Sequence, residues 1–209
     1  MKWIEFVFAF LLMGIATTRI GTSQAATVVA PESEIWIEGK SNVSKFSCRA
    51  RSMSGYGRVA AEGATERVSA DAEALLAVSV LSFDCGNARM NSDLFEALKA
   101  DTHPTIHFKM ERANVVGYQP SGSVELDVTG IIMVAGVARS VQTRVVGDRL
   151  ANGQLRAAGA ILVSMRDFKI NPPTALLGLV RTRNDITVRF DLVAAPSTGV
   201  SMVGRAHAN

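Results

Sequence analysis

Residues 122–146 read GSVELDVTGIIMVAGVARSVQTRVV, and this stretch indicates the class of fold that the chain adopts. Apolar and polar residues alternate over Gly122–Val134, which is typical of a β-strand with one buried face. The small residues of Ala135-Gly136 then predict a tight turn. The alternation resumes over Val137–Val146. The stretch therefore predicts two long antiparallel strands joined by a hairpin.

Strand patterns of the same kind extend along most of the chain, whereas helical periodicity is rare. Near Leu81 the alternation changes phase, which indicates a bulge. Only residues 91–100 predict a helix, with Asn91-Ser92-Asp93 as its N-terminal cap. Besides the hairpin, we expect strands over Ser33–Gly39, Val43–Ala50, Glu73–Asp84, Thr105–Ala113, Gln154–Ser164 and Ile186–Ala194.

Roughly eight antiparallel strands and one short helix predict an all-β fold, either a barrel or a sandwich. Strands of about ten residues favour an eight-stranded antiparallel barrel. The interior of such a barrel is either filled by side chains or holds one small or slender ligand. Strand alternation is the same in both cases, so it does not distinguish a packed core from a cavity.

The composition is that of an ordinary globular protein, with 48% hydrophobic and 20% charged residues in a chain of 209. This length fits one domain or two small ones. The chain has 22 basic and 19 acidic residues, a formal net charge of +3. The basic residues are scattered instead of clustered on one helix or stripe, which argues against nucleic-acid binding.

The N-terminus has the pattern of a secretory signal peptide. A positively charged start precedes the unbroken apolar run Phe6–Ile15, and the small residues of Ser23-Gln24-Ala25 predict cleavage before Ala26. A transmembrane anchor, the alternative, needs about 20 apolar residues. We therefore expect an exported protein. Its expected parts are a signal peptide (residues 1–25), one domain (26–195) and a flexible tail (196–209).

The two cysteines of the chain, Cys48 and Cys85, both lie in the part that would be exported. An oxidising compartment favours a disulfide between them. Two lone cysteines in a secreted domain are also usually a pair. The alternative is two free, buried thiols. We expect the disulfide, which would close a loop of about 37 residues.

Three segments together resemble the YceI-like family. Gly130–Val141, GIIMVAGVARSV, resembles the family hairpin G-x-L-T-I-x-G-V-T-K-P-V, with both glycines and the basic residue in register. Thr102–Phe108, THPTIHF, resembles the family segment K-Y-P-x-I-x-F. Asp167–Ile170, DFKI, resembles the end of the family stretch R-S-D-F-G-I. The order of these pieces agrees over residues 33–194.

The chain departs from the family pattern at several positions. Met133 and Ala138 replace threonines, Ser140 replaces proline, Met165 replaces an arginine, and Lys169 replaces a glycine. The two cysteines indicate a cysteine-bearing branch. The resemblance implies a lipocalin-like barrel whose apolar cavity binds a polyisoprenoid or a similar amphiphile, export to the periplasm or beyond, and often a homodimer. The lost arginine argues against a polar head-group contact there.

The residues themselves predict neither an active site nor a metal site. His103 and His107 would lie about 13 Å apart on a strand, too far to share a zinc ion. No G-x-S-x-G, G-x-G-x-x-G or P-loop motif occurs in the sequence. Asp167 and Asp185 have arginines nearby, so salt-bridge pairing is their simpler interpretation. We therefore expect no catalytic residue, no metal and no cofactor other than a bound amphiphile.

The inward residues of the expected strands are the candidates for a ligand-binding site, with a packed, dry core as the alternative. The loop Pro172–Leu179 is apolar for a loop. We interpret it as a lid or as a rim that touches a membrane, and simple packing over the barrel end is the alternative. The candidate lining residues are Trp36, Phe46, Val78, Val80, Phe83, Leu126, Val128, Ile161, Val163, Phe168 and Phe190.

The leading hypothesis is a secreted module that binds a lipophilic small molecule and makes transient contact with a membrane. The alternatives are an enzyme acting on a lipophilic or redox substrate and a partner protein with a filled barrel. An outer-membrane barrel needs apolar strand exteriors. The exteriors expected here carry charges, for example at Lys45, Glu125 and Arg189, which argues against that class.

Overall fold

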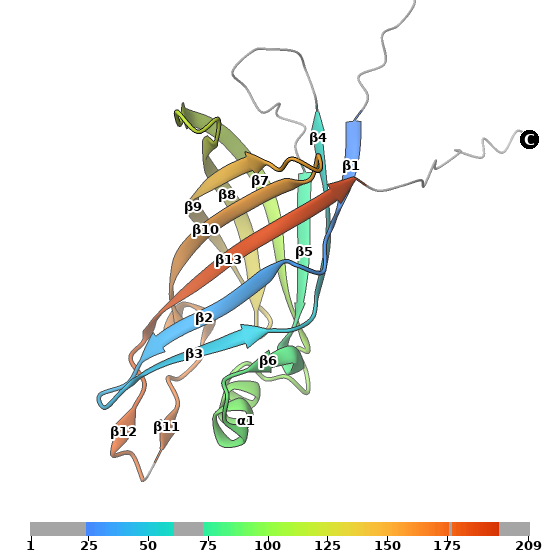
Figure 1. Cartoon of the computed structure of the whole chain (residues 1–209). Coiled ribbons are helices and arrows are strands. Elements are labelled where there is room, and N and C mark those ends of the chain that lie inside the picture. The colour runs from blue at the N-terminus through green and yellow to red at the C-terminus, as the bar shows by residue number, and fades with distance from the viewer. Residues whose placement is uncertain (1–23, 61–72, 176, 197–209) are drawn as a thin grey trace, which may run out of the picture.

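The computed structural model describes residues 24–60, 73–175 and 177–196 as a closed antiparallel β-barrel with one α-helix (Figure 1). The predicted all-β class and the eight-stranded barrel are confirmed. Residues 1–23 and 197–209, which include most of the expected signal peptide and tail, lie outside the described residues. In the described part of the chain, no helix is both long and apolar enough to cross a membrane.

Eight strands follow one another around the barrel wall. Each pairs antiparallel with its neighbours, and β1 pairs with β13 to close the ring. Closure leaves these strands with partners on both sides, which removes the free edges that an open sheet would expose. In order around the wall, the strands are β1 (Gln24–Val29), β4 (Met53–Ala60), β5 (Glu73–Ser79), β7 (Thr105–Tyr118), β8 (Val124–Val134), β9 (Val137–Arg149), β10 (Leu155–Ser164) and β13 (Asp185–Pro196).

Three strands of the wall are interrupted and continue towards the lower end of the barrel in Figure 1. The continuations are β2 (Glu34–Lys40), β3 (Lys45–Ala50) and β6 (Phe83–Asp84). They pair in the order β13–β2–β3–β6, so the order of strands around the wall continues beyond the breaks. Two breaks lie side by side, because the Arg51 N–H donates to the Ser82 carbonyl and the Ser79 N–H donates to the Ser52 carbonyl.

Side chains and local turns hold the breaks in place. The buried Ser33 hydroxyl donates to the Val193 carbonyl at 3.1 Å and accepts the Val193 N–H at 3.0 Å. Together with the Ala30 N–H, which donates to the same carbonyl at 2.8 Å, this hydroxyl keeps β13 hydrogen-bonded across the break between β1 and β2. A 3-10 turn over Val80–Ser82 separates β5 from β6. The turn explains the change of phase near Leu81, where the sequence predicted a bulge.

The helix α1 (Ala88–Ala97) lies at the lower end of the barrel (Figure 1) and begins earlier than predicted. Asn87 is the cap: its side-chain oxygen accepts the N–H groups of Arg89 and Met90. Asn91, the first residue of the predicted cap, lies inside the helix and accepts the Cys85 N–H at 2.7 Å. Asn87 therefore caps the helix, and Asn91 joins the helix to the backbone of Cys85.

The chain after β10 adds a second hairpin at the same end. A 3-10 turn over Met165–Phe168 packs inward, and both of these terminal residues are buried. β11 (Thr174–Ala175) and β12 (Val180–Arg181) then form a two-stranded sheet of their own. A β-bridge between Ser41 and Thr182 attaches this hairpin to the β2–β3 turn.

Cys48 on β3 and Cys85 after β6 form a disulfide, which confirms the predicted pairing. Cys48 is 1% exposed and lies in a core cluster with Ile37 and Phe83. The neighbouring Asp84 carboxylate accepts hydrogen bonds from the Arg51 guanidinium at 2.7 Å and from the Gly86 N–H at 2.8 Å. These bonds, led by the one from Arg51, lower the pKa of Asp84 to about 2.

Breaking the disulfide should destabilise the barrel. The bridge spans 37 residues, and a loop of this length corresponds to about 4 kcal/mol of stability in the chain-entropy model. We expect a reducing agent to lower the free energy of unfolding by about this amount. Urea titration would measure the loss as a lower unfolding midpoint. The double variant Cys48→Ala/Cys85→Ala is the control, since its midpoint should not respond to the reducing agent. Two free thiols in peptide mapping of the untreated protein would contradict the pairing.

Candidate functional site

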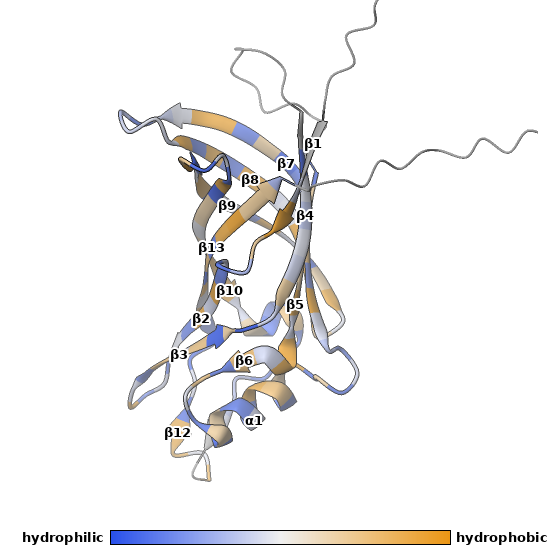
Figure 2. Ribbon diagram, turned by 45° about the vertical axis from the view of Figure 1, so that its right-hand side comes forward, coloured by the Kyte–Doolittle hydropathy of each residue, from blue (hydrophilic) through white to orange (hydrophobic). Residues whose placement is uncertain are grey.

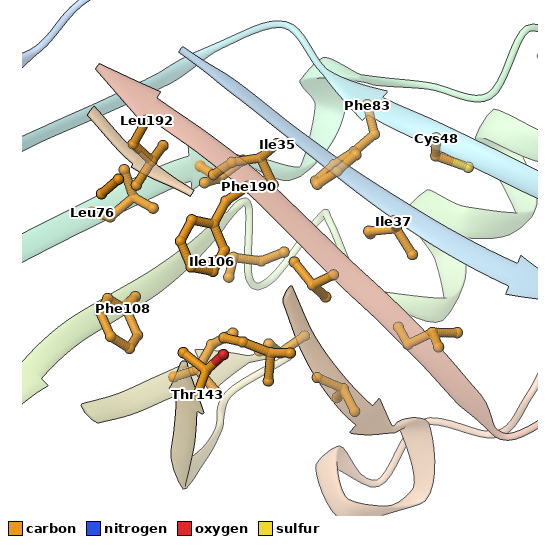
Figure 3. A pocket seen from close by; sticks show the side chains of 18 of the residues that line it. Ile35, Ile37, Cys48, Leu76, Phe83, Ile106, Phe108, Thr143, Phe190 and Leu192 are labelled. Carbon is orange, nitrogen blue, oxygen red and sulfur yellow. The ribbon is translucent and has the colours of Figure 1, made fainter. Parts of the chain in front are cut away.

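A cavity of about 820 Å³ runs along the inside of the barrel. Its lining comes from the strands of the wall, from β2 and β3, from α1 and from the 3-10 turn over Met165–Phe168. Small-molecule pockets have volumes of roughly 300–1,000 Å³, so this one is large. Figure 3 shows side chains converging on it from several strands, and nearly all of the labelled ones are apolar.

Hydrophobic and hydrophilic residues alternate along β8 and along the middle of β9, as the colours of the wall strands in Figure 2 illustrate. Leu126 lies opposite Val145 in the register, and these two residues line the cavity. The residues between them face outwards, where Arg144 pairs with Asp127 at 3.2 Å. The pattern that predicted the hairpin therefore also determines which residues reach the interior.

Most of the predicted lining residues lie along the cavity. They come from strands far apart in sequence, and the closed barrel brings them together around one space. Whether each of them contacts a ligand stays a prediction. The predicted residues that line the cavity are Phe46, Val78, Phe83, Leu126, Val128, Ile161, Val163, Phe168 and Phe190.

Trp36 and Val80 do not line the cavity, which corrects the expectation for these two residues. Trp36 follows the outer phase of β2: its indole N–H donates to Glu38 at 3.1 Å, and the Arg49 guanidinium lies 5.8 Å from its ring centroid. Val80 is 1% exposed, but it belongs to the 3-10 turn and packs into the core cluster with Phe168. Its position in a turn removes it from the strand alternation.

Several lining residues were not among the predicted ones. Their signal was present in the sequence, because each lies in the inward phase of a strand. Ile35 and Ile37 share one face of β2, and choosing the large Trp36 instead missed both. The unlisted apolar residues labelled in Figure 3 are Ile35, Ile37, Leu76, Ile106, Phe108 and Leu192.

Polar lining residues are few in the middle of the cavity. Thr143, labelled in Figure 3, is one of them. Its hydroxyl donates to the Ala160 carbonyl at 2.8 Å, just beyond the Gly159–Val145 pair at which the ladder between β9 and β10 ends. Because the hydroxyl already has a partner, it is a weak anchor for a ligand head group.

Charged lining residues of the described chain lie at the two ends of the cavity. Arg89 and Asp93 of α1 belong to the lower end. At the upper end, the charged lining residues are Arg58, Glu73, Asp148, Arg149 and Arg156. A ligand with an apolar body and a polar head group therefore meets apolar side chains along the barrel and charges only near an opening.

The carboxylates with perturbed pKa values lie away from the interior. The Arg189 guanidinium, helped by the Trp36 N–H, lowers the pKa of Glu38 on the outer face of β2. The Arg156 guanidinium lowers the pKa of Asp191 on β13. These shifts come from ion pairs on the barrel wall, so they do not indicate an acid or base inside the cavity.

Three phenylalanine rings pack closely against glycines of the wall. A Cβ atom built at Gly39 would lie 2.2 Å from the Phe46 ring, and one at Gly159 would lie 2.6 Å from the Phe190 ring. Gly130 has the same relation to Phe108, at 2.6 Å. The glycines therefore let these large rings pack close to the wall.

His103 and His107, the two histidines in the described part of the chain, lie outside the barrel interior. His103 packs over the β8–β9 turn, where its ring would lie 2.6 Å from a Cβ built at Gly136. His107 is opposite Met133 in the register, on the outer phase of β7. Among the described residues, no three His, Cys, Asp or Glu side chains gather in a metal-binding arrangement.

The predicted apolar loop Pro172–Leu179 includes the turn of the β11–β12 hairpin. Pro173 and Thr174 line the lower end of the cavity. Leu177 and Leu179 instead project into solvent. The loop is therefore part of a rim, and its two exposed leucines are not packed over the end of the barrel.

Comparison with known proteins gives one family and several similar folds. Residues 27–194 match the family model described as the YceI-like domain. BcnA from Burkholderia cenocepacia is 19% identical, with a TM-score of 0.62 over 78% of this chain and 96% of BcnA. No curated protein sequence matches the chain.

Two further solved structures resemble the barrel. A polyisoprenoid-binding domain from Saccharophagus degradans, implicated in plant cell wall breakdown, is 15% identical, with a TM-score of 0.61 over 84% of this chain and 100% of that domain. A YceI protein from Campylobacter jejuni is 16% identical, with a TM-score of 0.53 over 73% of this chain and 85% of that protein. At these identities the likeness shows a shared fold.

The close packing of Phe46 on Gly39 can be tested by adding one methyl group. Gly39→Ala should destabilise the barrel by about 1–3 kcal/mol, because the ring must leave the wall and crowd the cavity. Gly39→Ala/Phe46→Leu should recover most of this loss, as measured by urea unfolding. Gly117→Ala is the matched control, since the nearest atom to its added Cβ is 4.0 Å away. Equal stability of the two single variants would contradict the interpretation.

Proposed function

This chain belongs to the family of YceI-like domains, and from that premise we propose that it binds a polyisoprenoid or a similar amphiphile in its barrel. The observation that carries the proposal is the cavity of about 820 Å³, which is apolar along its middle and charged only near its ends. A slender apolar chain with one polar head group matches this distribution. The similarity to a polyisoprenoid-binding domain supports the same ligand class.

The cavity favours ligand binding over the two alternative functions. A filled barrel would leave no space of this size between its inward side chains. An enzyme that used Arg166 or Asp167 would need these groups to face the substrate, but both are exposed and neither lines the cavity. The proposed role is therefore to hold the amphiphile, for transport, storage or a stress response, without converting it.

We propose further that the protein is exported to the periplasm or beyond. The N-terminal pattern supports this location, and so does the Cys48–Cys85 disulfide, because structural disulfides persist in oxidising compartments. In such a compartment an apolar molecule needs a carrier to cross water.

Organic extraction of the purified protein, combined with native mass spectrometry, tests the ligand. We expect one amphiphile per barrel, released by solvent and absent after delipidation. Phe190→Asp should lower uptake of an offered polyisoprenoid at least about tenfold, because it introduces a charge into the apolar lining. Phe190→Ala enlarges the cavity without a charge and should retain uptake.

Leu162→Asp is the control for this series, because Leu162 is 75% exposed on the outside of β10. It should leave uptake unchanged. A folded wild-type protein that carries no lipid and takes none up would overturn the proposed function. Conversion of the bound amphiphile during incubation would instead favour the enzyme.

Export has its own test in cells that produce the full chain. We expect the protein in the periplasmic or secreted fraction, with a mature N-terminus at Ala26. N-terminal sequencing of the fractionated protein measures both. An intact Met1 in the cytoplasmic fraction would contradict the proposed location.

A further inference from the structure

Large apolar side chains are exposed on two adjacent hairpins at the lower end of the barrel. Leu177 is fully exposed and Leu179 is 74% exposed in the β11–β12 turn, and Val43 is 68% exposed in the β2–β3 turn. Figure 1 shows both hairpins projecting from the same end. Exposed apolar groups that gather in this way mark interaction sites more often than chance positions do. We call Val43, Leu177 and Leu179 the apolar tip.

Hydrogen bonds hold the two hairpins together. The Asn42 side chain donates to the Leu179 carbonyl at 2.9 Å and accepts the Arg181 N–H at 2.9 Å. The Arg183 N–H donates to the Lys40 carbonyl at 2.8 Å. The β2–β3 turn therefore holds the β11–β12 turn, and with it the exposed leucines, in a fixed position.

Basic residues surround the apolar tip. Residues 40–45 and 177–183 contain four Lys or Arg residues and no Asp or Glu, although the whole chain is nearly balanced at 22 basic and 19 acidic residues. All four are exposed, and none takes part in the six ion pairs found in the part of the chain that the structure describes. We call these four residues the basic collar: Lys40, Lys45, Arg181 and Arg183.

The cavity reaches the same two hairpins. Ser41 and Ser44 of the β2–β3 turn belong to its lining, as do Val180 and Thr182 beside the β11–β12 turn. The apolar tip and the basic collar therefore surround the lower end of the space in which the amphiphile is proposed to lie.

We propose that the apolar tip and the basic collar dock the lower end of the barrel on an anionic lipid bilayer. Lysine and arginine side chains attract anionic head groups, while apolar side chains enter the boundary between head groups and acyl chains. The charge of the collar matches an anionic bilayer and not a neutral one. The inference rests on the proposed function for its purpose, because a docked barrel would exchange its amphiphile with the bilayer.

Vesicle flotation of the mature protein, without the proposed signal peptide, tests the docking. The probes are vesicles of phosphatidylcholine alone and vesicles of phosphatidylcholine with phosphatidylglycerol at a ratio of 7:3. We expect binding to the anionic vesicles that weakens as salt is added, and much weaker binding to the neutral ones. Equal binding to both vesicle types would overturn the role of the collar.

Two matched substitutions test the apolar tip. Leu177→Ser/Leu179→Ser should weaken binding to the anionic vesicles about tenfold or more, because the tip loses its apolar area. Leu162→Ser is the control, since Leu162 is as exposed as Leu179 but lies on the barrel wall. In addition, Leu177→Trp should show a blue-shifted emission on anionic vesicles, and Leu162→Trp should not. Unchanged binding of the double variant would overturn the proposal.

The collar is tested by removing charges without changing the hairpin bonds of Arg181. Lys40→Gln/Lys45→Gln/Arg183→Gln should weaken binding to anionic vesicles, by about fivefold for each charge. Lys109→Gln/Arg112→Gln/Arg139→Gln removes three exposed charges elsewhere on the wall and is the control. An equal loss in both triple variants would show nonspecific attraction and would contradict the docking surface.

The outcomes separate docking from ligand binding. A protein that carries an extractable amphiphile but floats with neither vesicle type overturns the docking and leaves the proposed function standing. A protein that floats with anionic vesicles through the tip, but neither carries nor takes up an amphiphile, supports the docking and overturns the proposed function.

Discussion

The antiparallel pairing of β13 with its neighbours holds the barrel closed, and the other features depend on it. One edge of β13 pairs with β10, and the other pairs with β2 and then with β1. Because β1 and β2 share one edge of β13, the break between them is bridged by two residues: the Ala30 N–H donates to the Val193 carbonyl, and the Ser33 hydroxyl bonds to both backbone groups of Val193. Closure prevents the inward side chains from collapsing onto an opposite sheet, as they do in a sandwich. An apolar space remains along the axis.

The outside of the barrel is organised by charge. The Arg156–Asp191 and Arg189–Glu38 pairs join β13 to the strands on either side of it. Exposed pairs of this kind add little stability. They place charged groups on the outer phase of β2 and β13, which leaves the apolar phase of these two strands to face the interior. The lower end differs, because its exposed cations are near exposed leucines.

Much of the fold could be predicted because alternation has a fixed period. The hairpin over residues 122–146 showed where β8 and β9 lie and which of their residues face inwards. β4 was missed because its sequence, MSGYGRVA, contains two glycines and little alternation. β1 was missed because its residues adjoin the expected cleavage site. The helix cap was misplaced because two asparagines compete for it, and only the backbone at Asn87 is extended.

The candidate site was predicted less completely than the fold. Trp36 belongs to the outer phase of β2, and the 3-10 turn that removes Val80 from the strand alternation has no clear signal in the sequence. The cavity itself could not be predicted from the residues. A filled barrel and an open one have the same alternation, and the difference lies in how the large rings pack against the wall.

The packing of rings on glycines also constrains how this sequence can change over time. At Gly39 the three atoms nearest to an added Cβ all belong to the Phe46 ring, whereas at Gly130 and Gly159 the Cβ would also meet the backbone oxygens of Lys109 and Arg144, at 2.6 and 2.8 Å. A substitution of Gly39 or Phe46 alone leaves a clash or a gap in the lining. Gly39 and Phe46 therefore form one heritable unit that diverges most easily when both positions change together, whereas the backbone itself keeps Gly130 and Gly159 as glycines.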